Sequence, residues 1–215
     1  MSSLKSILLA IAAAAPLAFT SPVPEAAAKN ETMSIAAAPQ WYSGPWYNFP
    51  SMNTWRSFDD LYNIHSQYMA MTGSTWADIE KIRVSCQNIG GQYGIDPRVI
   101  LTMIMQESHG YVGVRTTYSW EGIPTAGLLQ CWNCVGYPGQ VNLSQEQIDN
   151  MVRGGVDHYK GNLRNWGDAM TESAIYPALR EYNSGNVNAN DLSDGRGATP
   201  NYVSDIAQRL QGWAD

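Results

Sequence analysis

Basic residues are scarce in this chain. Its 215 residues include 13 Lys and Arg against 19 Asp and Glu, which gives a formal net charge of −6, and the basic residues form no cluster. Binding to nucleic acid needs Lys and Arg gathered against phosphate, so we exclude a nucleic-acid partner. A negative charge does not exclude a glycan, which is recognised mainly through stacking and neutral hydrogen bonds.

Long apolar runs are also missing, apart from a short one near the N-terminus. Lys5 is followed by apolar and small residues over 7–18, which predicts a secretory signal peptide over 1–20, too short to span a membrane. Residues 21–40 are mostly Ala, Pro, Ser and Glu, which is typical of a pro-segment or disordered leader. We therefore expect one domain over 41–215 in a secreted, extracellular protein without a membrane span.

Cysteine and histidine are equally few. Cys86, Cys131 and Cys134 allow one internal disulfide, and the sequence does not decide between a Cys131–Cys134 bridge and one that involves Cys86. The CxxC spacing lacks the context of a redox motif, and a structural zinc site needs four ligands. The three histidines do not form a metal-ligand spacing either, so we expect no metal.

Helical patterns dominate the remainder of the chain. We expect a mainly α or α+β fold, with a small irregular or β lobe between Gly110 and Tyr137, where β-branched and aromatic residues replace helical periodicity. The predicted helices cover 58–71, 76–89 before Gly90-Gly91, 97–110, 145–159, 168–182 and a last segment introduced by Thr199-Pro200.

The predicted helix over 97–110 differs from the others because it is apolar on nearly all its faces. Asp96 is a good N-cap, Pro97 suits the first helical position, and Gly110 can adopt the left-handed conformation that ends a helix. A helix that is apolar all round lies inside a core. We therefore expect this segment to be the central buried helix.

Glu107 lies in the last turn of this helix. Apolar surroundings and the negative end of the helix dipole both oppose ionisation, so its pKa should be raised. A carboxylic acid that stays protonated near neutral pH suits a general acid that protonates a leaving oxygen, as in glycosidic bond cleavage. The alternative is that Glu107 points into solvent at the surface end of a core helix.

Three short motifs follow one another from this helix onward. They are Glu107-Ser108, Gly127-Leu-Leu-Gln130 and Glu181-Tyr-Asn-Ser-Gly185. In this order they resemble the E-S, G-L-M-Q and A-Y-N signatures of glycoside hydrolase family 23, the lytic transglycosylases and goose-type lysozymes. The resemblance covers about residues 76–213 and implies a lysozyme-like fold, with helices around a central catalytic helix.

The resemblance also implies roles for the motif residues. Glu107 would be the catalytic acid/base and Ser108 would help to orient the substrate or the carboxyl group. Gly127 and Gln130 would line the cleft, and Tyr182 and Asn183 would face Glu107 across it. The implied reaction is scission of β-1,4 bonds between N-acetylmuramic acid and N-acetylglucosamine in peptidoglycan, by lytic transglycosylation or hydrolysis, in a monomer without a cofactor.

Two further acids need interpretation. An inverting hydrolase uses a second carboxylate roughly 6.5–9.5 Å from the first. Glu121 is the only acid between Glu107 and Gln130, so it is the candidate for this role, the alternative being an ordinary exposed loop residue. Glu181 stands where the signature has Ala and puts another acid near the site, so a second useful carboxylate is one interpretation. On a helix it would point about 100° away from Tyr182, and we therefore expect it to pair with a nearby arginine such as Arg180 or Arg115.

Two other functions remain open at this point. Chitin has the same linkage and N-acetyl groups as peptidoglycan, so a chitin-directed glycosidase is an alternative. A catalytically inactive glycan-binding protein is another, but such a protein has no need of an acid at the end of an apolar helix. Products released from the two polymers distinguish these possibilities.

Overall fold

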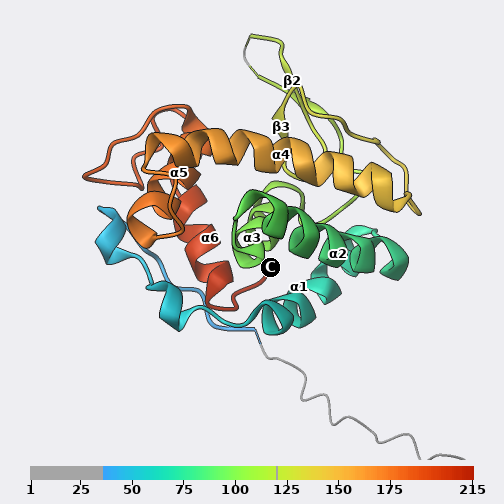
Figure 1. Ribbon diagram of the computed structural model, residues 1–215, viewed down its shortest axis with the longest axis horizontal. Coiled ribbons are helices and arrows are strands. Elements are labelled where there is room, and N and C mark those ends of the chain that lie inside the picture. Colours follow the sequence, from blue (N-terminus) through green and yellow to red (C-terminus); the bar gives the residue numbers. More distant parts are fainter. Residues whose placement is uncertain (1–35, 120) are drawn as a thin grey trace, which may run out of the picture. The chain divides into compact units, whose positions relative to one another are not determined.

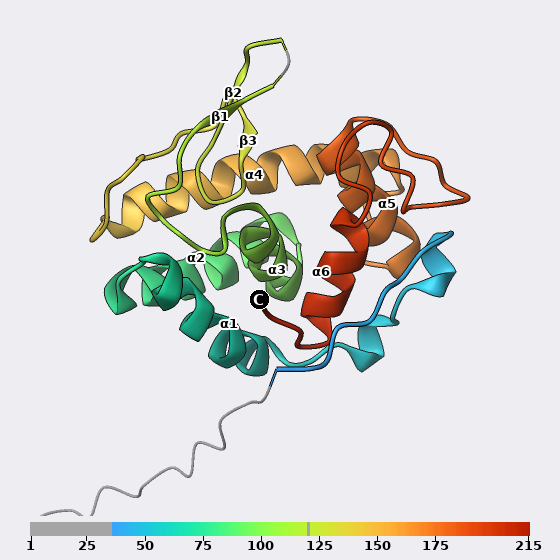
Figure 2. The same ribbon diagram turned by 180° about the vertical axis from the view of Figure 1, so that it is seen from behind.

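The computed structural model describes residues 36–119 and 121–215, which contain six α-helices, two short 3₁₀-helices and three strands (Figures 1 and 2). The predicted signal peptide and residues 21–35 of the predicted leader lie outside the described residues. In chain order the elements are η1 (Trp46–Asn48), η2 (Met52–Thr54), α1 (Phe58–Thr72), α2 (Trp76–Tyr93), α3 (Pro97–Ser108), β1 (Thr117–Tyr118), β2 (Pro124–Ala126), β3 (Cys131–Trp132), α4 (Gln145–Asn165), α5 (Glu172–Ser184) and α6 (Tyr202–Leu210).

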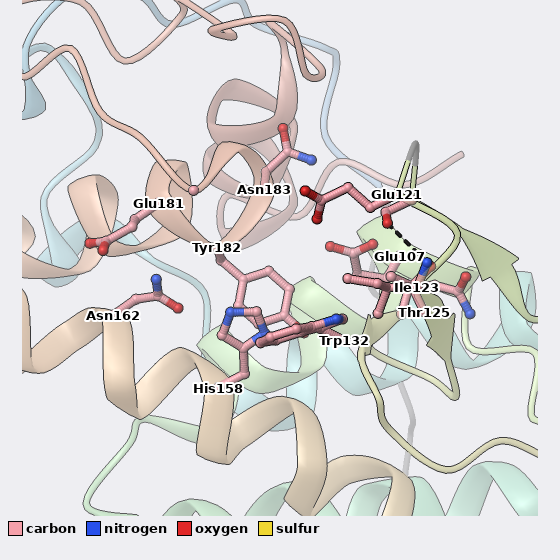
Figure 3. A pocket seen from close by; sticks show the side chains of 13 residues that line it. Glu107, Glu121, Ile123, Thr125, Trp132, His158, Asn162, Glu181, Tyr182 and Asn183 are labelled. Carbon is pink, nitrogen blue, oxygen red and sulfur yellow. Dashed lines mark hydrogen bonds between the residues drawn. The ribbon is translucent and has the colours of Figure 1, made fainter.

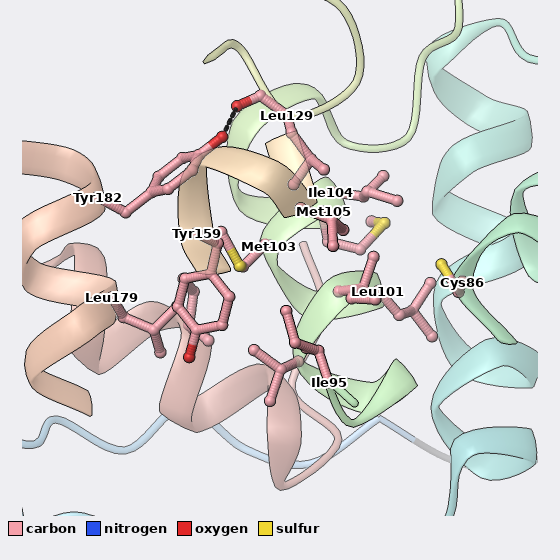
Figure 4. Packing of buried hydrophobic residues seen from close by; sticks show 14 of the residues in the cluster. Cys86, Ile95, Leu101, Met103, Ile104, Met105, Leu129, Tyr159, Leu179 and Tyr182 are labelled. Carbon is pink, nitrogen blue, oxygen red and sulfur yellow. Dashed lines mark hydrogen bonds between the residues drawn. The ribbon is translucent and has the colours of Figure 1, made fainter. Parts of the chain in front are cut away.

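Helix α3 occupies the centre, as predicted, and is packed against α1, α2 and α6. Eight of its 12 residues are buried. The side chain of Asp96 accepts a hydrogen bond from the backbone N–H of Arg98 (2.9 Å) and so caps the first turn. At the other end His109 adopts a left-handed conformation (φ 48°), one residue before the predicted Gly110. The apolar side chains of α3 interdigitate with those of the surrounding helices (Figure 4).

The predicted end of α2 is wrong. The helix does not stop at Gly90-Gly91 but continues to Tyr93, and Gly94 ends it in the left-handed conformation. Gly90 is buried, and a Cβ added to it would lie 2.7 Å from the carbonyl oxygen of Ile95. Its role is therefore to let the chain between α2 and α3 approach the helix closely, rather than to end the helix.

Three other predicted boundaries also shift. Helix α4 has the predicted capping box of Ser144 and Gln147 but runs beyond residue 159 to Asn165, and α5 begins at Glu172 rather than at 168. Helix α6 begins at Tyr202, and the carbonyl groups of Thr199 and Pro200 just before it accept hydrogen bonds from the guanidinium of buried Arg180 (3.0 and 3.4 Å). A contact between distant segments therefore holds the residues that lead into α6.

The segment between α3 and α4 forms a small antiparallel sheet in the order β1-β2-β3. Thr117 pairs with Thr125, and Thr125 pairs with Trp132 on the other side. The sheet and its loops project beside α4 (Figure 1). The mainly helical class with a small β lobe is confirmed.

The described chain is bonded to this fold from Ala37 onward. The backbone N–H of Ala37 donates to the carbonyl of Gly212 (2.8 Å), and that of Gln40 donates to Oε1 of Gln208 (2.7 Å). Both bonds lie upstream of the domain boundary predicted at residue 41, which stays a prediction. Across residues 36–119 and 121–215, no helix has the length and apolarity needed to cross a membrane.

Buried His65 on α1 makes stability depend on pH. Burial, together with the nearby charge of Arg209, lowers the pKa of His65 to about 3. The unfolded chain binds a proton at this residue below about pH 6.5, whereas the folded chain does so only near pH 3. The free energy of unfolding should therefore fall with decreasing pH across this window, by up to about 1.4 kcal/mol per pH unit. Urea unfolding from pH 7 to 4 should show a steeper loss in the wild type than in His65→Leu, and parallel curves would contradict this account.

Candidate functional site

A cavity of about 600 Å³ opens between the β lobe, α4 and the last turns of α3 and α5 (Figure 3). Five of the seven predicted site residues line it: Glu107, Glu121, Gln130, Tyr182 and Asn183. The other residues that line it are Ser119, Ile123, Thr125, Trp132, His158, Asn162, Glu181 and Gly185. The three sequence motifs thus meet at one place, although Glu107 and Glu181 are 74 positions apart in the sequence.

Glu107 is half-buried and borders this cavity. The surrounding protein desolvates its carboxyl group and raises the pKa of Glu107 to about 7, while a hydrogen bond from Tyr202 acts in the opposite direction. The raised pKa predicted from the sequence is confirmed, and burial is its cause. At neutral pH this group can therefore both give and take a proton.

Tyr202, the first residue of α6, was missed by the sequence prediction. Its buried hydroxyl donates to Oε1 of Glu107 at 2.5 Å. Burial and the neighbouring charge of Glu107 raise the pKa of Tyr202 well above its ordinary value, so the phenol stays a donor. No local pattern marks this residue, because its role depends on α6 lying against α3.

Tyr182 also lies close to Glu107, as the resemblance implied. It is buried, and its hydroxyl donates to the carbonyl oxygen of Leu129 (2.7 Å). Burial and the charge of Glu107 raise its pKa well above the ordinary value. Tyr182 therefore fixes the cavity wall through its hydroxyl while its ring faces the cavity (Figure 3).

Ser108 and Gly127 do not line the cavity but shape its wall. The buried hydroxyl of Ser108 lies 2.8 Å from the carbonyl oxygen of Leu128 and 3.0 Å from that of Ile104, so it links α3 to the loop over 127–130. Gly127 has φ 74°, and a Cβ there would lie 2.4 Å from the carbonyl oxygen of Val135. Only glycine fits this close approach.

Gln130 closes the same loop. Its own φ is 43°, and its Nε2 donates to the carbonyl oxygen of Gly127 (2.9 Å). Its Oε1 accepts from the hydroxyl of Thr117 (3.1 Å). The amide thus connects β1 to the loop while it borders the cavity.

Asn183 lies on the opposite wall. Its Oδ1 accepts hydrogen bonds from Nη2 of Arg180 and from the backbone N–H of Thr199. These bonds orient the amide so that its nitrogen lies on the side of Glu121 (Figure 3). Glu121 itself is exposed on the loop between β1 and β2 and reaches the same cavity.

The predicted arginine partner of Glu181 is wrong. The carboxylate accepts hydrogen bonds from Nδ2 of Asn165 and Nε1 of Trp166, both at 2.7 Å. Arg180 points into the core instead, and Arg115 is exposed on the segment before β1. Consecutive residues of a helix point about 100° apart, which explains why Arg180 and Glu181 face different surroundings.

The open question of disulfide pairing is resolved. Cys131 is bonded to Cys134, and Cys86 is a free thiol buried in the core. Within residues 36–119 and 121–215, no group of three His, Cys, Asp or Glu side chains could hold a metal ion. Trp132 and His158, which the sequence raised only as parts of possible redox or metal motifs, instead line the cavity.

This combination of a central buried helix, an acid at its end and a small antiparallel sheet beside the cavity is a lysozyme-like fold. The chain is 27% identical over 166 residues to "Lysozyme g" of Epinephelus coioides, a match that covers 68% of this chain and 80% of that protein. The chain is therefore a distant homologue of a goose-type lysozyme, and goose-type lysozymes belong to glycoside hydrolase family 23, whose signatures its motifs resemble. No family model matches the chain.

Replacing Tyr202 with Phe should raise the pKa of Glu107 further. The Tyr202 hydroxyl stabilises the ionised carboxylate, and a hydrogen bond to a charged group contributes about 1.5–3 kcal/mol. A ¹³C NMR titration of the side-chain carboxyl carbons measures this, with Glu107 assigned from its absence in Glu107→Gln. Tyr176→Phe is the matched control, because that buried hydroxyl donates to Pro50 instead (2.6 Å). An unchanged or lower pKa in Tyr202→Phe would show that the phenol does not hold the carboxylate.

Proposed function

We propose that this protein is a secreted muramidase. It would cleave β-1,4 bonds between N-acetylmuramic acid and N-acetylglucosamine in bacterial peptidoglycan. The observation that carries the proposal is a glutamic acid with a pKa of about 7, placed at a cavity large enough for sugar rings. The distant homology to a protein named lysozyme supports a glycan-cleaving activity of this kind.

Glu107 acts as both acid and base in the proposed mechanism. In its protonated form it donates a proton to the leaving glycosidic oxygen. The N-acetyl group of the substrate stabilises the positive charge that develops at the anomeric carbon, so no second protein carboxylate is needed for this step. Glu107, now ionised, then accepts a proton from the attacking hydroxyl.

The nature of that hydroxyl decides the product. Attack by the 6-hydroxyl of the same sugar gives an anhydro-sugar, as in lytic transglycosylation, whereas attack by water gives hydrolysis. Tyr202 stabilises the ionised form of Glu107, which the second step requires as a base. A partner that favours the charged state keeps the pKa of Glu107 close to neutral rather than higher.

The other cavity residues would bind the sugar. Gln130 and Asn183 supply amide groups and Tyr182 supplies a ring, and protein hydrogen bonds hold the orientation of all three side chains. Such preorganised groups can be directed at the sugar without rearrangement. Ser108 and Gly127 would contribute indirectly, by holding the 127–130 loop in place.

Export would follow from the predicted signal peptide over 1–20, with 21–40 as a leader ahead of the lysozyme-like domain. The Cys131–Cys134 disulfide supports an oxidising compartment. An extracellular location also suits a cell-wall substrate.

Glu107→Gln should abolish cleavage of peptidoglycan, with a loss of at least about 10²-fold, because the amide can neither donate nor accept the proton. Mass spectrometry of digested peptidoglycan and chitin oligomers provides the measurement. Glu146→Gln, which removes an exposed carboxylate in the first turn of α4, is the control.

The products also separate the alternatives. Anhydro-muramyl ends indicate transglycosylation and reducing ends indicate hydrolysis. Cleavage of chitin alone would replace the muramidase by a chitin-directed glycosidase. Binding of either polymer without cleavage by the wild type would indicate a glycan-binding protein, and full activity of Glu107→Gln would overturn the mechanism.

Glu121→Gln tests the second carboxylate. In the alternative mechanism Glu121, which reaches the cavity from the β1–β2 loop, takes the proton from water in place of Glu107, so its loss should then lower the yield of reducing ends but spare anhydro products. The ratio of the two products in the same digest measures this directly. An unchanged ratio with an unchanged rate would remove Glu121 from the mechanism.

A further inference from the structure

Trp132 is unusual among the aromatic residues because it is 59% exposed and lines a cavity. Several other large aromatics of the described chain are exposed, but none of them lines this cavity: Trp41, Trp46, Tyr47, Trp76 and Tyr118. Trp132 lines this cavity together with His158 and Tyr182 (Figure 3). An exposed indole beside a reaction centre presents an apolar face that a ligand can cover.

The backbone around Trp132 is fixed on both sides. Trp132 pairs with Thr125 in the sheet. The Cys131–Cys134 disulfide closes the chain directly across Trp132 and Asn133. The backbone N–H of Asn133, which has φ 55°, donates to the carbonyl oxygen of Pro124 (2.9 Å).

The disulfide is seated on α4. A Cβ added to Gly154 would lie 2.8 Å from Sγ of Cys134 and 3.6 Å from Sγ of Cys131. Glycine at position 154 thus lets the disulfide rest against the helix backbone. His158 follows four residues later on the same face of α4, and it lines the same cavity as Trp132.

His158 adds a second ring to the cavity lining. Its imidazole ring packs against Tyr182 with 4.8 Å between ring centroids. Trp132, His158 and Tyr182 therefore form an aromatic part of the lining of the cavity that Glu107 also borders (Figure 3). Thr125, which pairs with Trp132, and Gln130 add polar groups to the same lining.

We infer that Trp132 is a stacking platform for a pyranose ring of the substrate, and that the Cys131–Cys134 disulfide is its positioning device. A pyranose has an apolar C–H face and polar hydroxyl edges, which match an indole face flanked by threonine and glutamine. This inference rests on the proposed function, because it assumes a glycan in the cavity. It adds a sugar-binding residue and a positioning disulfide, both of which lie outside the three sequence motifs.

Stacking acts on the bound sugar before and during bond cleavage. Its loss should therefore raise KM and leave kcat nearly unchanged. Trp132→Ala should weaken glycan binding at least about tenfold, and Trp132→Phe, which keeps a smaller ring, should retain part of it. Trp76→Ala is the matched control, because Trp76 is 57% exposed at the start of α2 and does not line the cavity.

Binding is measured by calorimetry in the Glu107→Gln background. The ligands are N-acetylglucosamine oligomers and peptidoglycan glycan strands from which the stem peptides have been removed. This background separates the two proposals. If the protein binds neither glycan, and the wild type cuts neither, the proposed function and this inference fail together. If it binds a glycan and Trp132→Ala binds it equally well, the stacking role alone is overturned.

The role of the disulfide needs a separate test. The double variant Cys131→Ser/Cys134→Ser should bind the glycan more weakly. Adding Trp132→Ala to this double variant should lower the affinity less than Trp132→Ala does when both cysteines are present, because the two changes affect one interaction. Full additivity in a folded protein would overturn the positioning role.

A second variant keeps this test decisive if the serine variant does not fold. Gly154→Ala retains both cysteines but forces the disulfide away from α4, and it should also weaken glycan binding. Gly161→Ala on the same helix, where an added Cβ meets no atom within 4 Å, should bind as the parent does. Equal binding by the Gly154 and Gly161 variants, with equal melting temperatures, would contradict the inference.

Discussion

The burial of Glu107 is the constraint on which the rest of the structure depends. Helix α3 carries apolar side chains into the core along nearly its whole length, and its last turn emerges at a cavity. The same packing that stabilises the fold thereby shields one carboxyl group from much of the surrounding water. The hydrogen bond from the Tyr202 hydroxyl offsets part of that cost and keeps the pKa of the acid close to neutrality. Packing of α3 therefore contributes both to the stability of the fold and to the raised pKa of Glu107.

The cavity wall is held by hydroxyl groups that reach the loop over 127–130 from opposite sides. Ser108 lies within hydrogen-bonding distance of the carbonyl oxygen of Leu128, and Tyr182 donates to that of Leu129. Two neighbouring carbonyl groups are therefore satisfied by residues from two different motifs. The first and third motifs therefore both hold the second one in place.

Much of this arrangement could be predicted from the sequence. The helix over 97–108 has both ends marked by capping residues and apolar side chains between them, and the position of Glu107 in its last turn follows directly. The order of the motifs, through the family resemblance, predicted that Gln130, Tyr182 and Asn183 lie at the same site. Capping boxes at Thr75 and Ser144 gave the starts of α2 and α4 correctly. The helix ends depend on contacts between residues that are near in sequence, whereas the shared site of Gln130, Tyr182 and Asn183 was implied by the family resemblance.

What the sequence did not reveal depends on contacts between distant segments. Tyr202 was missed because its partner, Glu107, lies on another helix, and only the packing of α6 against α3 brings the two together. Gly90 reads as a helix end, although its missing side chain serves the approach of the chain near Ile95. Glu181 has an arginine as its immediate neighbour, but helix geometry turns the two apart, and its partners come from the end of α4. A one-dimensional pattern contains none of these pairings.

The last turn of α5 limits how this sequence can diverge. Arg180 binds the carbonyl groups that precede α6, Tyr182 supports the loop beside Glu107, and Asn183 returns to Arg180. One turn of helix thus serves the core, the site and the entry to the next helix at once. Inserting or deleting a single residue here would rotate all of these groups together, so evolution or engineering can alter this turn by substitution but not by changing its length.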